Sequence, residues 1–164
     1  MALSVMVETK PLRGIHQRRE KVVRVKDVLT HKGDKVVTVR PDASCRDLLE
    51  TLAQYNIGAV VVSLDGTTVA GIASERDVVR SLHSRGAEVL DGPVSDIATL
   101  EVETCGPDDP LDELRETMTR RRIRHIPVVS DGSLVGIVSI GDVVKSTISE
   151  LESERQQLID YLHS

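Results

Sequence analysis

Two stretches of this sequence each place a serine and an aspartate three residues apart after an apolar run. They are GIASERDVV at residues 71–79 and GIVSIGDVV at residues 136–144, which pair Ser74 with Asp77 and Ser139 with Asp142. Ser-x-x-Asp can form a capping box, in which the hydroxyl accepts from a backbone N–H one turn on and the carboxylate reaches back to the N–H of the serine. This chemistry needs no ligand, so one occurrence alone would predict only the start of a helix.

The two stretches belong to an internal repeat. Gly, Ile, Ser, Asp, Val and Val coincide in order, and the similarity continues upstream through an Asp-Gly turn and a helical segment. The chain is therefore read as two copies of one unit of about 60 residues. We divide it into a basic N-terminal arm (1–21), a first repeat (22–83), a linker (84–93), a second repeat (94–148) and a C-terminal helical tail (149–164).

Each unit predicts the element order β-α-β-β-α. Because so small a unit cannot bury both faces of its own sheet, we expect an α+β fold in which the tandem repeats pack through their sheets, followed by a C-terminal helix. Asp65-Gly66 and Asp131-Gly132 predict hairpin turns. The expected strands are 35–39, 59–63 and one ending at Ser74 in the first repeat, and 100–104, 126–130 and one ending at Ser139 in the second.

One helix of each repeat is predicted from apolar residues at helical spacing. Ser44 and Asp47 fit a capping box at the first of these helices, while Asp109 can cap the second and Pro110 suits its first turn. The side chains expected to be buried are Leu48, Leu49 and Leu52 in the first repeat and Leu111, Leu114 and Met118 in the second.

Composition excludes several classes of function. The net charge of −5 and the presence of only two aromatic residues, both tyrosine, argue against a nucleic-acid-binding protein. Cys45 and Cys105 lie in no metal-ligand or dithiol motif, and the five histidines are scattered, so we expect neither a metal site nor an enzyme. No apolar run is long enough to span a membrane, which leads us to expect a cytoplasmic protein.

The doubled unit with GIASERD and GIVSIGD resembles the CBS domain, and its tandem arrangement resembles a Bateman module. Both copies carry the family pattern Gly-hydrophobic-x-Ser/Thr-x-x-Asp, and the resemblance covers roughly residues 22–148. MTRRRIRHIPVV at residues 118–129 is similar to the small stand-alone CBS-pair proteins in particular. The stretch at 44–47 lacks the Gly-hydrophobic lead and a preceding strand, so there we keep the capping interpretation alone.

The resemblance implies that adenine nucleotides (AMP, ADP, ATP or NAD(H)) bind in clefts between the repeats, with no catalytic cofactor. Asp77 and Asp142 would bind the ribose hydroxyls. Ser74, Ser139 and the helix N-termini would face phosphate, together with the basic side chains of Arg76, Arg124 and His125. The adenine slot would be lined by main-chain groups of Thr38, Ile57, Gly58, Ala59 and Ile123.

The repeats differ at one point of this implied site. Gly58 and Ala59 stand in the first repeat where Arg124 and His125 stand in the second. We therefore expect unequal clefts, the second binding phosphate more tightly. Because an unperturbed histidine gains charge as the pH falls through about 6.5, tighter binding at mildly acid pH is also expected.

The leading interpretation is a non-catalytic regulatory module that senses energy or redox state for a partner protein. The alternative is a dimerisation or interaction scaffold whose clefts stay empty. The tail places Ile148, Leu151, Leu158 and Leu162 on one helical face, interrupted by Arg155. This stripe has to pack on a partner subunit or back on the sheets, and we expect a homodimer.

Overall fold

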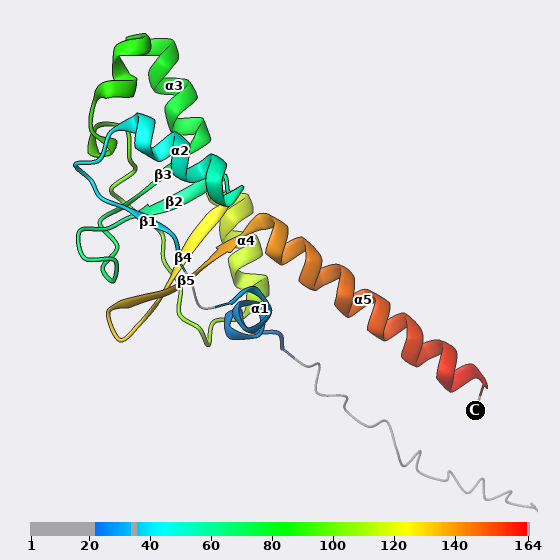
Figure 1. The fold of residues 1–164 in the computed structure, drawn as a ribbon. Helices are drawn as coiled ribbons and strands as arrows, with labels where there is room; N and C mark the ends of the chain where they lie inside the picture. Colours follow the sequence, from blue (N-terminus) through cyan, green and yellow to red (C-terminus); the bar gives the residue numbers. More distant parts are fainter. Residues whose placement is uncertain (1–21, 34–35, 164) are drawn as a thin grey trace, which may run out of the picture.

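The computed structural model describes residues 22–33 and 36–163, so the basic arm (1–21) lies outside the described residues. Figure 1 shows mixed helices and small sheets, with a long C-terminal helix that projects from the rest of the chain. The first half contains α1 (Val25–Lys32), β1 (Thr38–Val39), α2 (Cys45–Tyr55), β2 (Ala59–Val62), β3 (Gly71–Ser74) and α3 (Glu75–Arg85). The second contains the 3-10 helices η1 (Ala87–Asp91) and η2 (Val94–Asp96), then α4 (Leu111–Arg121), β4 (His125–Ser130), β5 (Ser133–Ser139) and α5 (Ile140–His163).

The described strands form two small sheets. In the first, β1 runs parallel to β2, and β2 pairs antiparallel with β3, so that Ala59 lies opposite Ser74. In the second, β4 and β5 pair antiparallel and His125 lies opposite Ser139. The equivalent pairing places both Ser-x-x-Asp motifs at the same point, where the last strand of a repeat passes directly into a helix.

The strand predicted at 100–104 is wrong. Only Cys105 pairs with the second sheet, through a single parallel bridge to Val128. The preceding segment is used elsewhere, because Thr99 exchanges backbone hydrogen bonds of 2.9 and 3.0 Å with Ile72 on the free edge of β3. The strand predicted at 35–39 is found only at Thr38–Val39, with residue 35 outside the described part.

Each repeat has its own apolar core, and each core is completed by the segment that begins the other repeat. Val25 of α1 is fully buried in the second core, beside Leu111, Leu114 and Met118. In the same way, Val94 of η2 is fully buried in the first core. Main-chain hydrogen bonds fix both crossings, from Leu111 N to Val23 O at 2.9 Å and from Val94 N to Ala43 O at 2.8 Å.

Five of the six apolar helix residues predicted to be buried are buried, and Leu49 is the exception at 36% exposure. Leu49 sits next to the core-facing Leu48 but points to the outer face of α2. The predicted capping role of Asp109 is also wrong. Pro110 is the N-cap of α4 without a side-chain cap bond, while the Asp109 carboxylate accepts from Gly106 N at 2.8 Å within the preceding turn.

The two Asp-Gly turns differ. Asp131 and Gly132, with φ of +50° and +77°, form the predicted two-residue hairpin between β4 and β5. Asp65-Gly66 instead lies in a loop of residues 63–70, because the Asp65 carboxylate accepts from the backbone N–H groups of Thr67 and Thr68, each at 2.8 Å. These hydrogen bonds lower the pKa of Asp65 and hold a wider loop in place of a tight turn.

Candidate functional site: two Ser-x-x-Asp clamps

The first clamp, Ser74 with Asp77, is a capping box at the start of α3. Ser74 donates to Asp77 Oδ2 from its N at 2.8 Å and from its hydroxyl at 2.6 Å, and its Oγ accepts from Asp77 N at 3.4 Å. All three bonds use one oxygen of the carboxylate. Oδ1 has no hydrogen-bond partner among the described residues, so the clamp retains acceptor capacity at the helix N-terminus.

The second clamp, Ser139 with Asp142, repeats this geometry at the start of α5. Ser139 donates to Asp142 Oδ2 from its N and from its hydroxyl, each at 2.8 Å, and Oγ accepts from Asp142 N at 3.2 Å. The capping interpretation is thus confirmed for both motifs. It leaves the ligand-binding interpretation open, because the serine hydroxyl can rotate and one carboxylate oxygen is not used.

Lys32, at the end of α1, makes the two clamps different. Its Nζ lies 2.7 Å from Asp142 Oδ2 and donates to the carbonyl of Ile137 at 3.0 Å. Burial raises the pKa of Asp142, but hydrogen bonds from Lys32 and Ser139 outweigh burial, so its pKa lies below the usual value. Asp77 has no ion pair within the described ranges.

The beginnings of β2 and β4 meet near the clamps. A Cβ placed on Gly58 would lie 3.7 Å from both His125 Cε1 and Glu75 Oε2, so the two repeats approach each other at this corner. Burial lowers the pKa of His125, and the positive charges of Lys32 and Arg124 lower it further, against Asp142 and Glu75. The ring therefore takes up a proton less readily than an ordinary histidine, which weakens the basis for tighter binding at mildly acid pH.

The other basic residues proposed for phosphate are exposed. Arg76 lies on the first turn of α3 and Arg124 directly before β4, and neither guanidinium has an ion-pair partner in the part of the chain that the structure describes. Both are free to turn toward an anion at the helix N-termini. Arg124 also accepts from Ile140 N through its carbonyl at 2.9 Å, which ties it to the start of α5.

The residues proposed for the adenine slot differ in which of their backbone groups are already used in hydrogen bonds within the protein. Ile57 and Ile123 use their N–H groups to close the ends of α2 and α4, donating to Leu52 and Met118 at 3.0 and 3.1 Å. The Gly58 carbonyl accepts from Glu75 N at 3.1 Å. Thr38 lies in β1, in register with the central strand β2, and Ala59 is buried.

Two features of this region were not found from the sequence, namely Lys32 and Glu75. Lys32 carries a signal that could have found it. When the segments starting at Val25 and Val94 are aligned, Lys32 falls opposite Glu101, a reversal of charge at one position of the repeat. Glu75 follows Ser74 directly and carries no comparable signal, since an acid in the first turn of a helix is common.

Metal and thiol chemistry find no support in the described residues. No group of three His, Cys, Asp or Glu side chains there is placed to hold a metal ion. Burial raises the pKa of the Cys105 thiol to about 12, and burial also raises that of Cys45, so both stay protonated at neutral pH. Within the same residues, no helix is long and apolar enough to cross a bilayer.

Comparison with known proteins agrees with this fold and these motifs. The family model of the CBS domain matches residues 25–84 and 94–148. The mitochondrial CBS domain-containing protein CBSX3 of Arabidopsis thaliana is 35% identical over 146 residues, which cover 84% of this chain and 71% of that protein. The chain therefore belongs to the CBS-domain family and contains two CBS domains in tandem.

Solved structures resemble this one closely. A CBS-domain containing protein from Agrobacterium tumefaciens is 47% identical, with a TM-score of 0.73, and the match covers 76% of this chain and 99% of that one. A CBS domain protein from Pyrobaculum aerophilum, crystallised in complex with AMP, is 32% identical with a TM-score of 0.65. That match covers 73% of this chain and 89% of the other.

Proposed function

We propose that this protein is a regulatory module that binds an adenine nucleotide at its two Ser-x-x-Asp clamps and performs no chemistry of its own. The observation that carries the proposal is the repeated clamp, a carboxylate with a free oxygen held at the start of a helix, once in each repeat. The AMP complex of the Pyrobaculum aerophilum relative supports the choice of ligand.

The proposed roles follow from the chemistry of each group. Asp77 and Asp142 accept the two ribose hydroxyls, which a carboxylate with unused lone pairs can do. The phosphate lies at the N-termini of α3 and α5, where the helix dipole and the N–H groups of the first turn, released in part when the serine hydroxyl turns, favour an anion. The serine hydroxyls turn from the carboxylate to the phosphate, and exposed Arg76 and Arg124 add charge-assisted hydrogen bonds.

The test is a calorimetric titration of the full chain with AMP, ADP, ATP, NAD+ and NADH, with inorganic phosphate and GMP as controls. We expect at least one adenine nucleotide to bind with a dissociation constant below about 1 mM, or −4.1 kcal/mol. It should also raise the thermal midpoint as mass action requires. Absence of binding by every adenine nucleotide would favour the alternative, a scaffold with empty clefts.

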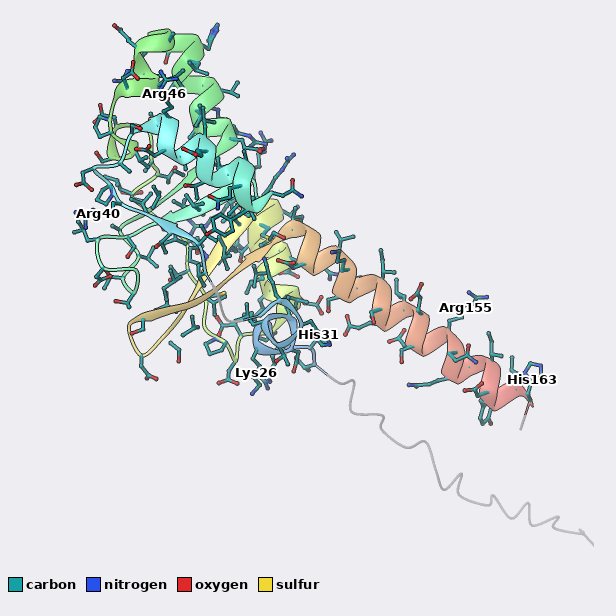
Figure 2. The ribbon with its side chains drawn as sticks, in the orientation of Figure 1. Lys26, His31, Arg40, Arg46, Arg155 and His163 are labelled. Carbon is teal, nitrogen blue, oxygen red and sulfur yellow. The ribbon has the colours of Figure 1, made fainter. Side chains whose placement is uncertain are left out.

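We further propose that the chain is a homodimer joined through α5. Val144, Ile148, Leu151, Leu158 and Leu162 are 50 to 79% exposed, so the stripe does not pack back on the sheets. With Arg155 the positions 144, 148, 151, 155, 158 and 162 alternate in steps of four and three, the spacing of a coiled-coil seam. Figure 2 shows Arg155 on the projecting part of α5, and Glu152 and Glu154 beside it can offset its charge from a second copy.

Replacing both Leu151 and Leu158 by glutamine should make the protein monomeric. The reason is that each leucine side chain buried in the seam contributes about 1.5–3 kcal/mol, so the dimer loses four such contributions from its two copies. Sedimentation at micromolar concentration measures the result, with Ser153→Gln on the outer face of the same helix as the control. A monomeric wild type, or a dimer that survives the double substitution, would contradict this mode of association.

The cytoplasmic location and the regulated partner stay predictions.

A further inference from the structure

The segment that begins each repeat crosses to the other repeat, and the two crossing segments bring different groups to the two clamps. In the first repeat, the carbonyl of Ile72 accepts from the backbone N of Thr99 at 2.9 Å. In the second repeat, the equivalent carbonyl of Ile137 accepts from Lys32 Nζ at 3.0 Å. A side-chain ammonium therefore stands where the other repeat has a backbone N–H, and it brings a positive charge that the first clamp does not receive.

That ammonium also occupies the carboxylate of the second clamp. Asp142 Oδ2 accepts from Ser139 N, from the Ser139 hydroxyl and from Lys32 Nζ. Among the described residues, Asp77 Oδ2 accepts from the two donors of Ser74 alone. A carboxylate oxygen offers about two lone-pair positions. When the serine hydroxyl turns away, Asp77 Oδ2 gains a free position, whereas Asp142 Oδ2 remains filled by a backbone N–H and the ammonium.

The ion pair between Lys32 and Asp142 is partly shielded from water, so screening reduces its strength only in part. The Asp142 side chain is 18% exposed and that of Lys32 is 39% exposed. Lys26, one and a half turns earlier on α1, pairs with Asp108 at the same 2.7 Å, but there the side chains are 56% and 74% exposed. Screening by water therefore weakens the Lys26–Asp108 pair much more than the Lys32–Asp142 pair.

We infer that Lys32 is an internal competitor for the ribose-binding carboxylate of the second clamp. This inference rests on the proposed function. A ribose diol held by both carboxylate oxygens can bind at the Asp77 clamp directly, whereas it can bind at the Asp142 clamp only when the Lys32 ammonium leaves Oδ2. The two clefts of one chain therefore differ in affinity, in the order opposite to that expected from Arg124 and His125.

The experiment isolates the second clamp and uses adenosine, which has the diol but no phosphate for a lysine to contact. Calorimetry compares Asp77→Ala with the double variant Asp77→Ala/Lys32→Met, since methionine keeps the length of the side chain and removes its charge. We expect the double variant to bind adenosine about tenfold more tightly, as loss of a charged hydrogen bond to a competitor requires. Asp77→Ala/Lys26→Met is the matched control and should bind as Asp77→Ala does.

Equal or weaker adenosine binding by the Lys32→Met variant would overturn the inference. If wild type binds AMP at one clamp and Lys32→Met alone adds no second site, the inference fails while the proposed function stands. If no variant and no wild-type chain binds any adenine ligand, the proposed function fails and the inference falls with it. A thermal midpoint for Lys32→Met close to that of wild type establishes that α1 still covers the second core.

Discussion

Replacing Asp77 by alanine is expected to remove most of the adenine-nucleotide affinity of this protein. Asp77 belongs to the clamp without an ion pair among the described residues, so it is the carboxylate that a ribose diol can reach without displacing a cation. Hydrogen bonds to a charged acceptor contribute about 1.5–3 kcal/mol each, which corresponds to a loss of about 10- to 150-fold in the dissociation constant. Isothermal titration with the nucleotide that binds wild type most tightly measures the effect.

Asp47 provides the matched control. Ser44 donates to Asp47 Oδ2 from its N at 3.0 Å and from its hydroxyl at 2.7 Å, the same capping box as in the clamps, at the start of α2. Asp47→Ala should therefore lose the same capping energy, about 0.5–2 kcal/mol of stability, without loss of nucleotide affinity. An equal loss of affinity in both variants would mean that Asp77 acts only as a cap.

The three capping boxes show which part of the site could be predicted from sequence. A capping box is local, because its donor and acceptor lie three residues apart, and all three were predicted correctly from residue types alone. The tight turn at Asp131-Gly132 is local in the same sense. The resemblance to the CBS domain was needed to assign a ligand to two of these boxes. Geometry cannot make that distinction, because the box at Ser44 has the same hydrogen bonds and lacks only the Gly-hydrophobic lead.

The crossing of the segments that begin the two repeats was not predicted, and the error at 100–104 and the missed role of Lys32 follow from it. The segment 100–104 could not form a strand in its own repeat because Thr99 pairs with the other sheet. The contact of Lys32 with Asp142 joins residues 110 positions apart, which no local pattern indicates. Such contacts depend on whether the segment that begins each repeat covers the core of its own repeat or the core of the other repeat. The repeat pattern in the sequence is the same in both cases.

The glycines that begin the two motifs, Gly71 and Gly136, lie against the crossing segments. A Cβ on Gly71 would lie 3.0 Å from the Thr99 carbonyl oxygen, and one on Gly136 would lie 2.6 Å from Leu29 Cδ2. Each glycine thus leaves room for the segment that begins the opposite repeat, which is a physical reason for glycine at this place in both motifs. In the sequence alone, these glycines are visible only as part of a family pattern.

The largest effect on stability is expected from Leu48→Ala. Leu48 is completely buried in the first core, where Val89, Val94 and Ile97 of the following segment also lie. Removing its side chain leaves a cavity between α2 and that segment, and such substitutions lower the free energy of unfolding by about 2–5 kcal/mol. Because the second repeat begins with the segment that covers this core, both repeats should unfold together at the lower urea concentration.

Leu49→Ala, the adjacent substitution on the same helix, is the control for Leu48→Ala. Its side chain is 36% exposed, so the loss should stay near the ~0.5 kcal/mol typical of surface positions. Urea unfolding followed by circular dichroism measures both variants, and a lower midpoint with an unchanged slope identifies a loss of stability without a change in cooperativity. Two separate transitions in Leu48→Ala, with the second repeat unfolding at the wild-type midpoint, would show that the crossing segments do not couple the repeats.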